Sequence, residues 1–187
     1  FLNLSQIEII KNILKELSFY YSKNSLNCLD HEIKFSEKNE KIIQIHFDEK
    51  WIYKNYIKNY TKIEPKKDEF IHLLDKIQTH KNAKLIITTG YKLPEIINSI
   101  TQELDNRKIK LFSNLNFYEL TKITLKSNIL ISCHGAISHV AAANNIKQVD
   151  IIDKSYNYSR WSSHFRNYQF VHREKFNTLT NNIIEKL

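Results

Sequence analysis

The fold is decided by residues 129–143, whose sequence is ILISCHGAISHVAAA. An apolar run at residues 128–132 predicts a buried strand, and the small residues at 136–145 predict a helix. Gly135, one of only two glycines in the chain, lies in the turn between them. An apolar strand that turns directly into a helix is the repeating unit of parallel α/β sheets.

The same alternation extends in both directions from this unit. Apolar runs predict four more strands, at residues 42–47, 85–89, 109–112 and 148–152. Helical spacing predicts the segments between them, at residues 70–77, 94–104 and 116–123. Strands that alternate with helices of about ten residues imply right-handed crossovers. The predicted fold class is therefore α/β: a Rossmann-like parallel sheet with helices on both faces.

The two ends of the chain add an N-terminal helix and a C-terminal helical tail. A capping box and helical spacing predict a helix over residues 5–21, and a polar linker follows it through residue 39. We expect a leading segment, residues 1–40, and one Rossmann-like domain, residues 41–187. The tail, residues 156–187, is aromatic and basic, and we expect it to pack back on the sheet. Tyrosine-rich residues 51–60 favour a short packed helix, with stacking on a nucleic-acid base as the alternative.

Composition limits the partners and the compartment. The net charge of +8 favours anionic partners, which include nucleotides, phosphorylated sugars, nucleic acid and acidic lipid surfaces. No apolar run reaches the roughly 20 residues of a membrane-spanning helix. Cys28 and Cys133 have no zinc-ligand spacing, which fits a reducing compartment. We therefore predict a cytoplasmic protein, with peripheral binding at the inner face of the membrane as a further expectation.

Ligands of parallel α/β sheets bind beyond the carboxyl ends of the strands, where helix N-termini point at the ligand. The strongest candidate is the turn after residues 128–132, which suits a diphosphate held by His134, Ser138 and His139. The alternative is a tight turn whose histidines only cap the helix or hydrogen-bond the backbone. The spacing of the two histidines predicts no metal site.

Residues 129–143, followed by residues 149–153 and Arg160-Trp161, resemble the nucleotide-sugar-binding half of GT-B glycosyltransferases. The similarity is strongest to the ADP-heptose:lipopolysaccharide heptosyltransferase family, and it spans roughly residues 41–172. That family's Asp-Ser/Thr-Gly-x-x-His pattern corresponds to residues 134–139, with His134 in the place of the acidic residue. The His-Gly-Ala triplet also resembles the donor-site turn of family 61 type glycosyltransferases.

The resemblance implies a role for each candidate residue. The donor diphosphate would be received by the turn after the fourth strand, at Ser132, His134, Gly135, Ala136, Ser138 and His139. Thr88, Thr89 and Gly90 would line the same crevice, and Asn116 would border the base. Three residues would act in catalysis by offsetting charge on the departing nucleoside diphosphate, namely His46, Lys50 and Arg160. No metal or other cofactor would be required.

The predicted function is a glycosyltransferase donor-binding domain that takes a nucleotide-diphosphate sugar. Its acceptor would be a cell-surface glycan or glycolipid, such as a lipopolysaccharide core. No general base is assigned, because GT-B enzymes usually supply it from the N-terminal acceptor domain. The chain has no Met and begins at Phe1, so we expect it to be the C-terminal part of a longer enzyme. The alternatives are a basic, non-catalytic nucleic-acid-binding α/β domain and a Rossmann-like scaffold without a ligand.

Overall fold

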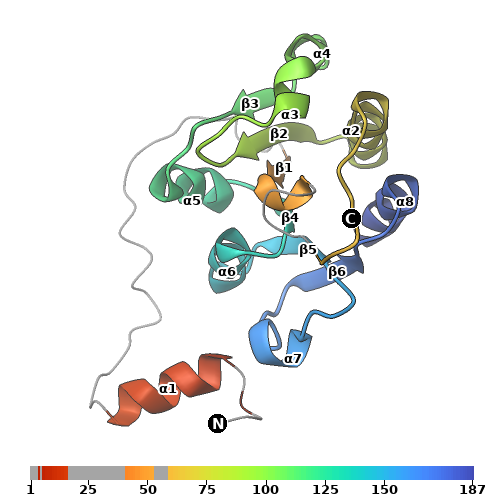
Figure 1. Ribbon diagram of the computed structural model, residues 1–187. Helices are drawn as coiled ribbons and strands as arrows, with labels where there is room; N and C mark the ends of the chain where they lie inside the picture. Colours follow the sequence, from red (N-terminus) through yellow and green to blue (C-terminus); the bar gives the residue numbers. More distant parts are fainter. Residues whose placement is uncertain (1–3, 5, 17–40, 53–58) are drawn as a thin grey trace.

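The computed structural model describes residues 4, 6–16, 41–52 and 59–187, which form a single six-stranded sheet with helices around it (Figure 1). The strands are β1 (Ile42–Phe47), β2 (Lys84–Thr89), β3 (Lys110–Phe112), β4 (Ile129–Cys133), β5 (Lys147–Ile152) and β6 (Tyr168–His172). Their order is β3-β2-β1-β4-β5-β6, and every neighbouring pair is parallel. This is the Rossmann order, so the predicted fold class is confirmed.

The helices cover both faces of the sheet, as Figure 1 shows. Their bounds are α1 (Gln6–Glu16), η1 (Glu49–Trp51), α2 (Lys67–Lys81), α3 (Glu95–Ser99), α4 (Thr101–Asn106), α5 (Phe117–Leu125), α6 (Ala136–Ala143), α7 (Tyr158–Trp161) and α8 (Phe176–Lys186). Helices α2, α3, α4 and α8 contribute to the larger hydrophobic cluster on one face. Helices α5 and α6 pack on the opposite face in smaller clusters.

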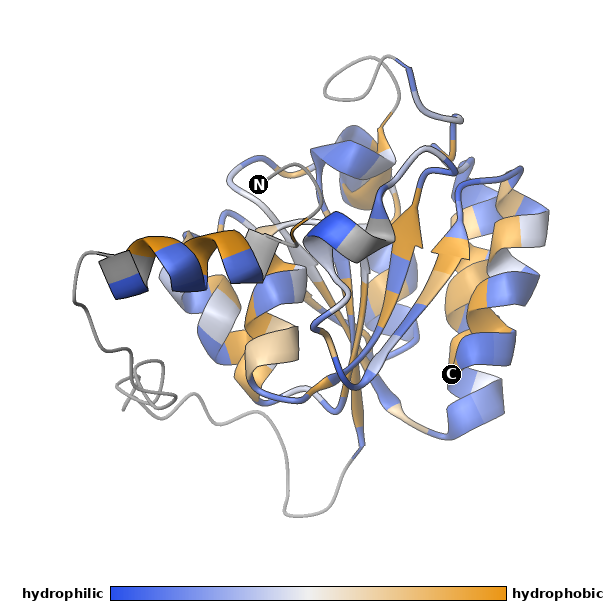
Figure 2. Cartoon of the chain, turned by 90° about the horizontal axis from the view of Figure 1, so that it is seen from below, coloured by the Kyte–Doolittle hydropathy of each residue, from blue (hydrophilic) through white to orange (hydrophobic). Residues whose placement is uncertain are grey.

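The central strands β1, β2, β4 and β5 are buried on both sides of the sheet, which is why they are nearly continuous apolar runs. Every residue of β1 is buried, and the helices that pack on the sheet turn their hydrophobic residues toward it (Figure 2). Phe47, Trp51 and Phe70 form an aromatic cluster with ring centroids 5.0 to 6.4 Å apart. Trp51, at the start of the tyrosine-rich segment, therefore belongs to the core, whereas residues 53–58 lie outside the described residues.

Two predicted elements differ from the structure. The helix predicted over residues 94–104 is divided into α3 and α4, because Ile100 leaves helical geometry with φ −114° and ψ 11°. Pro94 precedes α3 rather than standing in its first turn. The C-terminal tail also contains a strand that was not predicted, β6, since an edge strand with exposed residues lacks a clear apolar run. Helix α8 packs against α2.

The N-terminal segment is described only in part. Helix α1 confirms the predicted helix over residues 6–16. Ser5, residues 17–21 and the predicted linker lie outside the described residues. No helix among the described parts of the chain is long and apolar enough to cross a membrane.

Candidate functional site

A cavity of about 380 Å³ lies at the carboxyl edge of the sheet, where ligands bind in this topology. Strands β1 and β4 are neighbours in the sheet but far apart in the sequence, and the chain continues from them into η1 and α6. The segments that follow β1, β4, β5 and β6 all reach the cavity. It is lined by Lys50, Tyr60, Cys133, His134, Gly135, Ala136, Ile151, Ile152, Asp153, Tyr156 and Arg173.

The turn between β4 and α6 brings the backbone close to a lysine side chain. A Cβ atom added at Gly135 would lie 2.6 Å from Nζ of Lys50 and 3.3 Å from its Cε. The backbone at Gly135 is extended, with φ −175°, so glycine matters here for the space that it leaves and not for its backbone freedom. The absence of a side chain at Gly135 lets the Lys50 ammonium lie over the start of α6.

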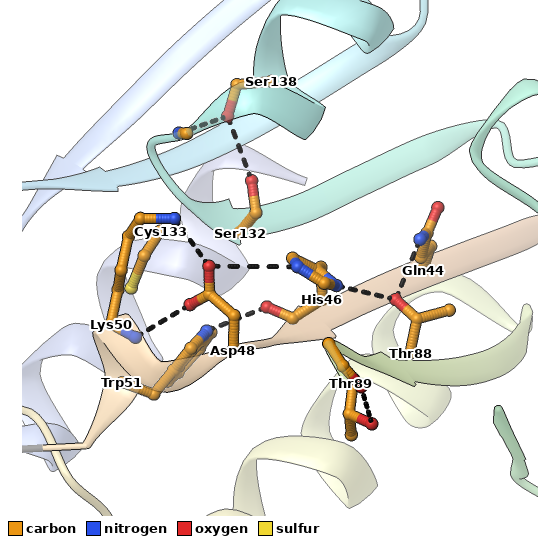
Figure 3. A network of polar contacts seen from close by, with 12 residues as sticks. Gln44, His46, Asp48, Lys50, Trp51, Thr88, Thr89, Ser132, Cys133 and Ser138 are labelled. Atoms are coloured by element: carbon orange, nitrogen blue, oxygen red, sulfur yellow. Dashed lines mark hydrogen bonds and ion pairs between the residues drawn. The ribbon is translucent and has the colours of Figure 1, made fainter. Parts of the chain in front are cut away.

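Asp48 holds that ammonium in place (Figure 3). Nζ of Lys50 lies 2.7 Å from Oδ2 of Asp48, and the Lys50 backbone N–H donates to Oδ1 at 3.0 Å. His46 lies on the other side of the same carboxylate, with its Nε2 3.8 Å from Oδ2. Its Nδ1 makes a 3.1 Å hydrogen bond with the hydroxyl of Thr88, which in turn accepts from Gln44. His46 therefore contacts Asp48, and Asp48 in turn holds Lys50.

Burial and charge shift the pKa of Lys50 in opposite directions. Burial by itself lowers the pKa, but the charge of Asp48 and the hydrogen bond to it outweigh burial, so the pKa lies above its usual value. Lys50 is consequently a cation at neutral pH. A positive charge held at a fixed point is what an anionic ligand requires.

Arg173, after β6, adds a second cation to the cavity. Its side chain is buried, and it donates to the carbonyl oxygens of Thr61 at 3.0 Å and Lys50 at 2.8 Å. It also contacts the sulfur of Cys133 at 3.6 Å. These acceptors are neutral, and they orient the guanidinium; the nearby carboxylate of Asp153 interacts with its charge. Asp153 is the acidic side chain in the lining, and its carboxylate accepts from the N–H groups of Thr61 and Ser155.

Asp150, in β5, fixes the turn from the other side. Its side chain is fully buried, and Oδ1 accepts hydrogen bonds from the hydroxyls of Ser132 at 3.0 Å and Ser138 at 2.8 Å. Oδ2 lies 2.7 Å from Nδ1 of His134. Nε2 of His134 then lies 2.7 Å from the hydroxyl of Tyr156. One carboxylate thus positions the strand end, the first turn of α6 and the imidazole at the cavity.

Three of the ten predicted binding residues line this cavity: His134, Gly135 and Ala136. Thr88, Thr89, Ser132 and Ser138 are fully buried. Their hydroxyls bind neighbouring protein groups, and none of these four residues lines the cavity.

The remaining predicted residues lie elsewhere. Asn116 caps α5 in a capping box with Glu119, and Gly90 lines a second cavity of about 520 Å³ beside Glu49. His139 is half-buried, with its ring centroid 5.4 Å from that of His134. Arg160 is exposed on α7, its guanidinium 5.5 Å from the ring centroid of Trp161. Of the three predicted catalytic residues, only Lys50 lines the cavity, and His46 acts on it through Asp48.

Asp150, Tyr156 and Arg173 were not among the site residues predicted from the sequence. The signal for Asp150 was an acidic residue in the middle of an apolar strand, because a carboxylate buried in a sheet requires partners. Tyr156 and Arg173 gave no such signal, since tyrosines and basic residues are abundant in this chain. No cluster of three or more His, Cys, Asp or Glu side chains suited to a metal occurs within the described ranges.

The buried His46 couples folding to pH. Its pKa lies below the usual 6.5 because burial penalises the charged form, and the attraction of Asp48 offsets only part of that effect. In the unfolded chain the same imidazole takes up a proton near its ordinary pKa, so the unfolded state binds more protons below that pH. The stability contributed by neutral His46 is therefore present above about pH 6.5 and lost as the pH falls further.

We expect the parent protein to lose more unfolding free energy than His46→Gln between about pH 8 and about pH 5. Urea unfolding followed by circular dichroism at several pH values measures this difference. A constant difference in unfolding free energy between the two proteins does not matter, because only the slopes of unfolding free energy against pH are compared. His139 and His164 also have lowered pKa values, so the variant keeps part of the slope. Identical slopes would show that His46 titrates normally in the folded protein.

No protein family model matches this chain, and no curated protein matches it either. Several solved structures are similar to it in fold. E. coli heptosyltransferase WaaC with ADP-2-deoxy-2-fluoro heptose is 10% identical with a TM-score of 0.55, over 93% of this chain and 53% of that chain. E. coli ADP-heptose lps heptosyltransferase II is 11% identical with a TM-score of 0.59, over 90% of this chain and 51% of that one.

A third similar structure is Methanocaldococcus jannaschii UDP-GlcNAc 2-epimerase in complex with UDP-GlcNAc and UDP. It is 9% identical with a TM-score of 0.53, over 80% of this chain and 39% of that one. The chain thus spans about half, or less, of the length of the solved structures it matches. At these identities the likeness concerns the fold.

Proposed function

We propose that this chain is the donor-binding half of a GT-B type glycosyltransferase that uses a nucleoside-diphosphate sugar, because its Rossmann-like sheet is similar in fold to about half of the heptosyltransferase structures. The observation that carries the proposal is the cavity at the carboxyl edge of the sheet. There the Lys50 ammonium and the Arg173 guanidinium meet the glycine turn before α6. Fixed cations beside a helix N-terminus suit a diphosphate.

The same groups fit the chemistry of glycosyl transfer. When the bond between the sugar and the phosphate breaks, negative charge develops on the departing diphosphate. Lys50 and Arg173 are held by protein partners before any ligand arrives, so they stabilise that charge without reorganising. His46 and Asp48 position Lys50. This mechanism requires no metal ion.

The acceptor in this proposal is a cell-surface glycan or glycolipid, such as a lipopolysaccharide core. Two of the similar structures are heptosyltransferases, and the net charge of +8 suits a phosphorylated or acidic acceptor. The acceptor site and the general base would come from a second, N-terminal domain. The proposed location is the cytoplasm, at the inner face of the membrane.

Calorimetric titration of the chain with UDP, GDP, ADP and CMP, with and without magnesium, tests the proposal. We expect saturable binding of at least one nucleoside diphosphate. A short single-stranded oligonucleotide serves as the comparison. Salt-sensitive binding of the oligonucleotide alone would reject the donor-domain function and favour a nucleic-acid-binding domain.

Lys50→Met is expected to weaken nucleoside-diphosphate binding roughly 10- to 100-fold, the range of a lost hydrogen bond to a charged group. Lys110→Met is the matched control, because it removes the same charge from an exposed position at the start of β3, at the opposite edge of the sheet. The comparison separates a contact with the ligand from the general effect of lowering the net charge. Equal losses in the two variants would contradict a specific role for Lys50.

A further inference from the structure

Four side chains form a continuous hydrogen-bonded network that connects the interior of the sheet with the cavity. Asp150 contacts His134 at 2.7 Å, His134 contacts Tyr156 at 2.7 Å, and Tyr156 contacts Ser162 at 2.7 Å. Asp150 and Ser162 are fully buried, whereas His134 and Tyr156 line the cavity. Charge complementarity with a diphosphate needs only the two cations, so this hydrogen-bonded network calls for a separate explanation.

The order of the donors follows from the acceptor at one end. A carboxylate only accepts, so Nδ1 of His134 carries a hydrogen and donates it to Asp150. In the neutral imidazole Nε2 has no hydrogen, and it accepts from the hydroxyl of Tyr156. The Tyr156 oxygen can then accept from the hydroxyl of Ser162. When His134 is neutral, each hydrogen bond of the network is donated in the direction of Asp150.

A proton added to His134 reverses the direction of the hydrogen bond between His134 and Tyr156, which lies nearest the cavity. In the imidazolium form Nε2 donates to the oxygen of Tyr156, and the hydrogen of Tyr156 turns away from His134. In the free protein the hydroxyl of Ser162 can accept it, because either oxygen of that pair can be the donor. A phosphate oxygen in the cavity would be another acceptor. The charged imidazole keeps its contact with the carboxylate of Asp150, whose other oxygen already accepts from Ser132 and Ser138. Both protonation states of His134 are therefore fully hydrogen-bonded.

We propose that Asp150, His134 and Tyr156 form a proton relay for the nucleoside diphosphate, an inference that rests on the function proposed above. Binding of the anion draws a proton onto His134, and Tyr156 donates its hydroxyl hydrogen to a phosphate oxygen. As the bond between the anomeric carbon and that oxygen breaks, the oxygen keeps the electron pair and takes the Tyr156 proton. The Tyr156 oxygen takes the Nε2 proton, and His134 becomes neutral. The acceptor hydroxyl, which forms the new bond to the sugar, gives its proton to the general base of the second domain proposed above.

Charged and aromatic side chains from several elements surround His134. Asp150 faces His134 from β5, and His139 faces it from α6. Tyr156 and Phe165 face it from the segment after β5. The pKa of His139 is lowered by burial first, and then by the charges of His134 and His164. His139 therefore stays neutral, while His134 has the carboxylate. The cations Lys50 and Arg173 line the same cavity as His134.

Calorimetric titration with the tightest-binding nucleoside diphosphate, in buffers of different ionisation enthalpy, counts the protons taken up on binding. At a pH near 7.5 we expect the parent to take up a substantial fraction of one proton, and His134→Gln to take up none. Gln can occupy the same space and make hydrogen bonds, but it does not titrate. His164→Gln, an exposed histidine that does not contact His134, is the matched control and is expected to behave like the parent.

Tyr156→Phe is the second variant, and it keeps the ring in place if His134→Gln does not fold. We expect it to weaken nucleoside-diphosphate binding about tenfold and to abolish most of the proton uptake. Equal uptake in the parent, His134→Gln and Tyr156→Phe overturns the relay while leaving the donor-binding function intact. Absence of proton uptake by a parent that binds the nucleotide also overturns it. A parent that binds no nucleoside diphosphate overturns the proposed function together with the relay.

Discussion

Replacement of Asp150 by alanine is expected to lower the free energy of unfolding by about 3 to 5 kcal/mol. The carboxylate is fully buried and accepts from Ser132, Ser138 and His134, so the variant leaves three polar groups without their acceptor. Because domains of this size are stable by about 5 to 15 kcal/mol, the loss is a large part of the total. Urea unfolding measured by circular dichroism tests the expectation.

Two further variants define the cause of that loss. Asp105→Ala removes an exposed carboxylate and is expected to change stability by less than about 0.5 kcal/mol. Asp150→Asn keeps the volume and one acceptor oxygen, so we expect it to be less destabilised than Asp150→Ala. A loss below about 1 kcal/mol in Asp150→Ala would show that the hydrogen bonds around Asp150 contribute little to stability.

Gly135→Ala is expected to weaken nucleoside-diphosphate binding at least tenfold, roughly 1.4 kcal/mol, with little change in stability. The new methyl group would lie 2.6 Å from Nζ of Lys50, and the flexible end of that side chain can move away. The extended backbone at position 135 accepts alanine without strain. The fold therefore remains, but the ammonium leaves the position that Asp48 gives it.

Gly90→Ala, at the other glycine of the chain, is the matched control. A Cβ at Gly90 would meet only Oε2 of Glu49, at 4.0 Å, which is an ordinary contact. Calorimetric titration of both variants, with thermal unfolding beside it, separates the effect on the site from an effect on the fold. Unchanged affinity in Gly135→Ala would place the diphosphate away from the Lys50 side chain.

The local parts of the fold were predictable because they depend on neighbouring residues. Each apolar run that predicted a strand became a strand of the sheet, and the capping box of Asn116 and Glu119 began α5 as expected. Strand β6 was missed, since an edge strand that packs on one side has no continuous apolar pattern. The break between α3 and α4 was missed too, because helical spacing continues through Ile100.

The candidate site was only partly predictable. Lys50, His134, Gly135 and Ala136 follow directly after strands, so the rule for parallel sheets found them. That rule also selected Thr88 and Thr89, which are fully buried, and it could not distinguish them because a strand end does not reveal which side chains point inward. Arg160 was chosen by resemblance, and the structure places it on an exposed helix outside the cavity lining.

The sequence by itself determined the class of the fold and the edge of the sheet at which the candidate site lies. The periodicity of apolar residues specifies strands and helices, and parallel strands bring their carboxyl ends to one edge. Only the tertiary structure decided which side chains meet there. Asp150 lies 16 residues after His134, and Arg173 lies 123 residues after Lys50, so these contacts depend on strand order and crossovers. Local sequence preference carries no information about pairs at such separations, because they form only when the whole sheet has assembled.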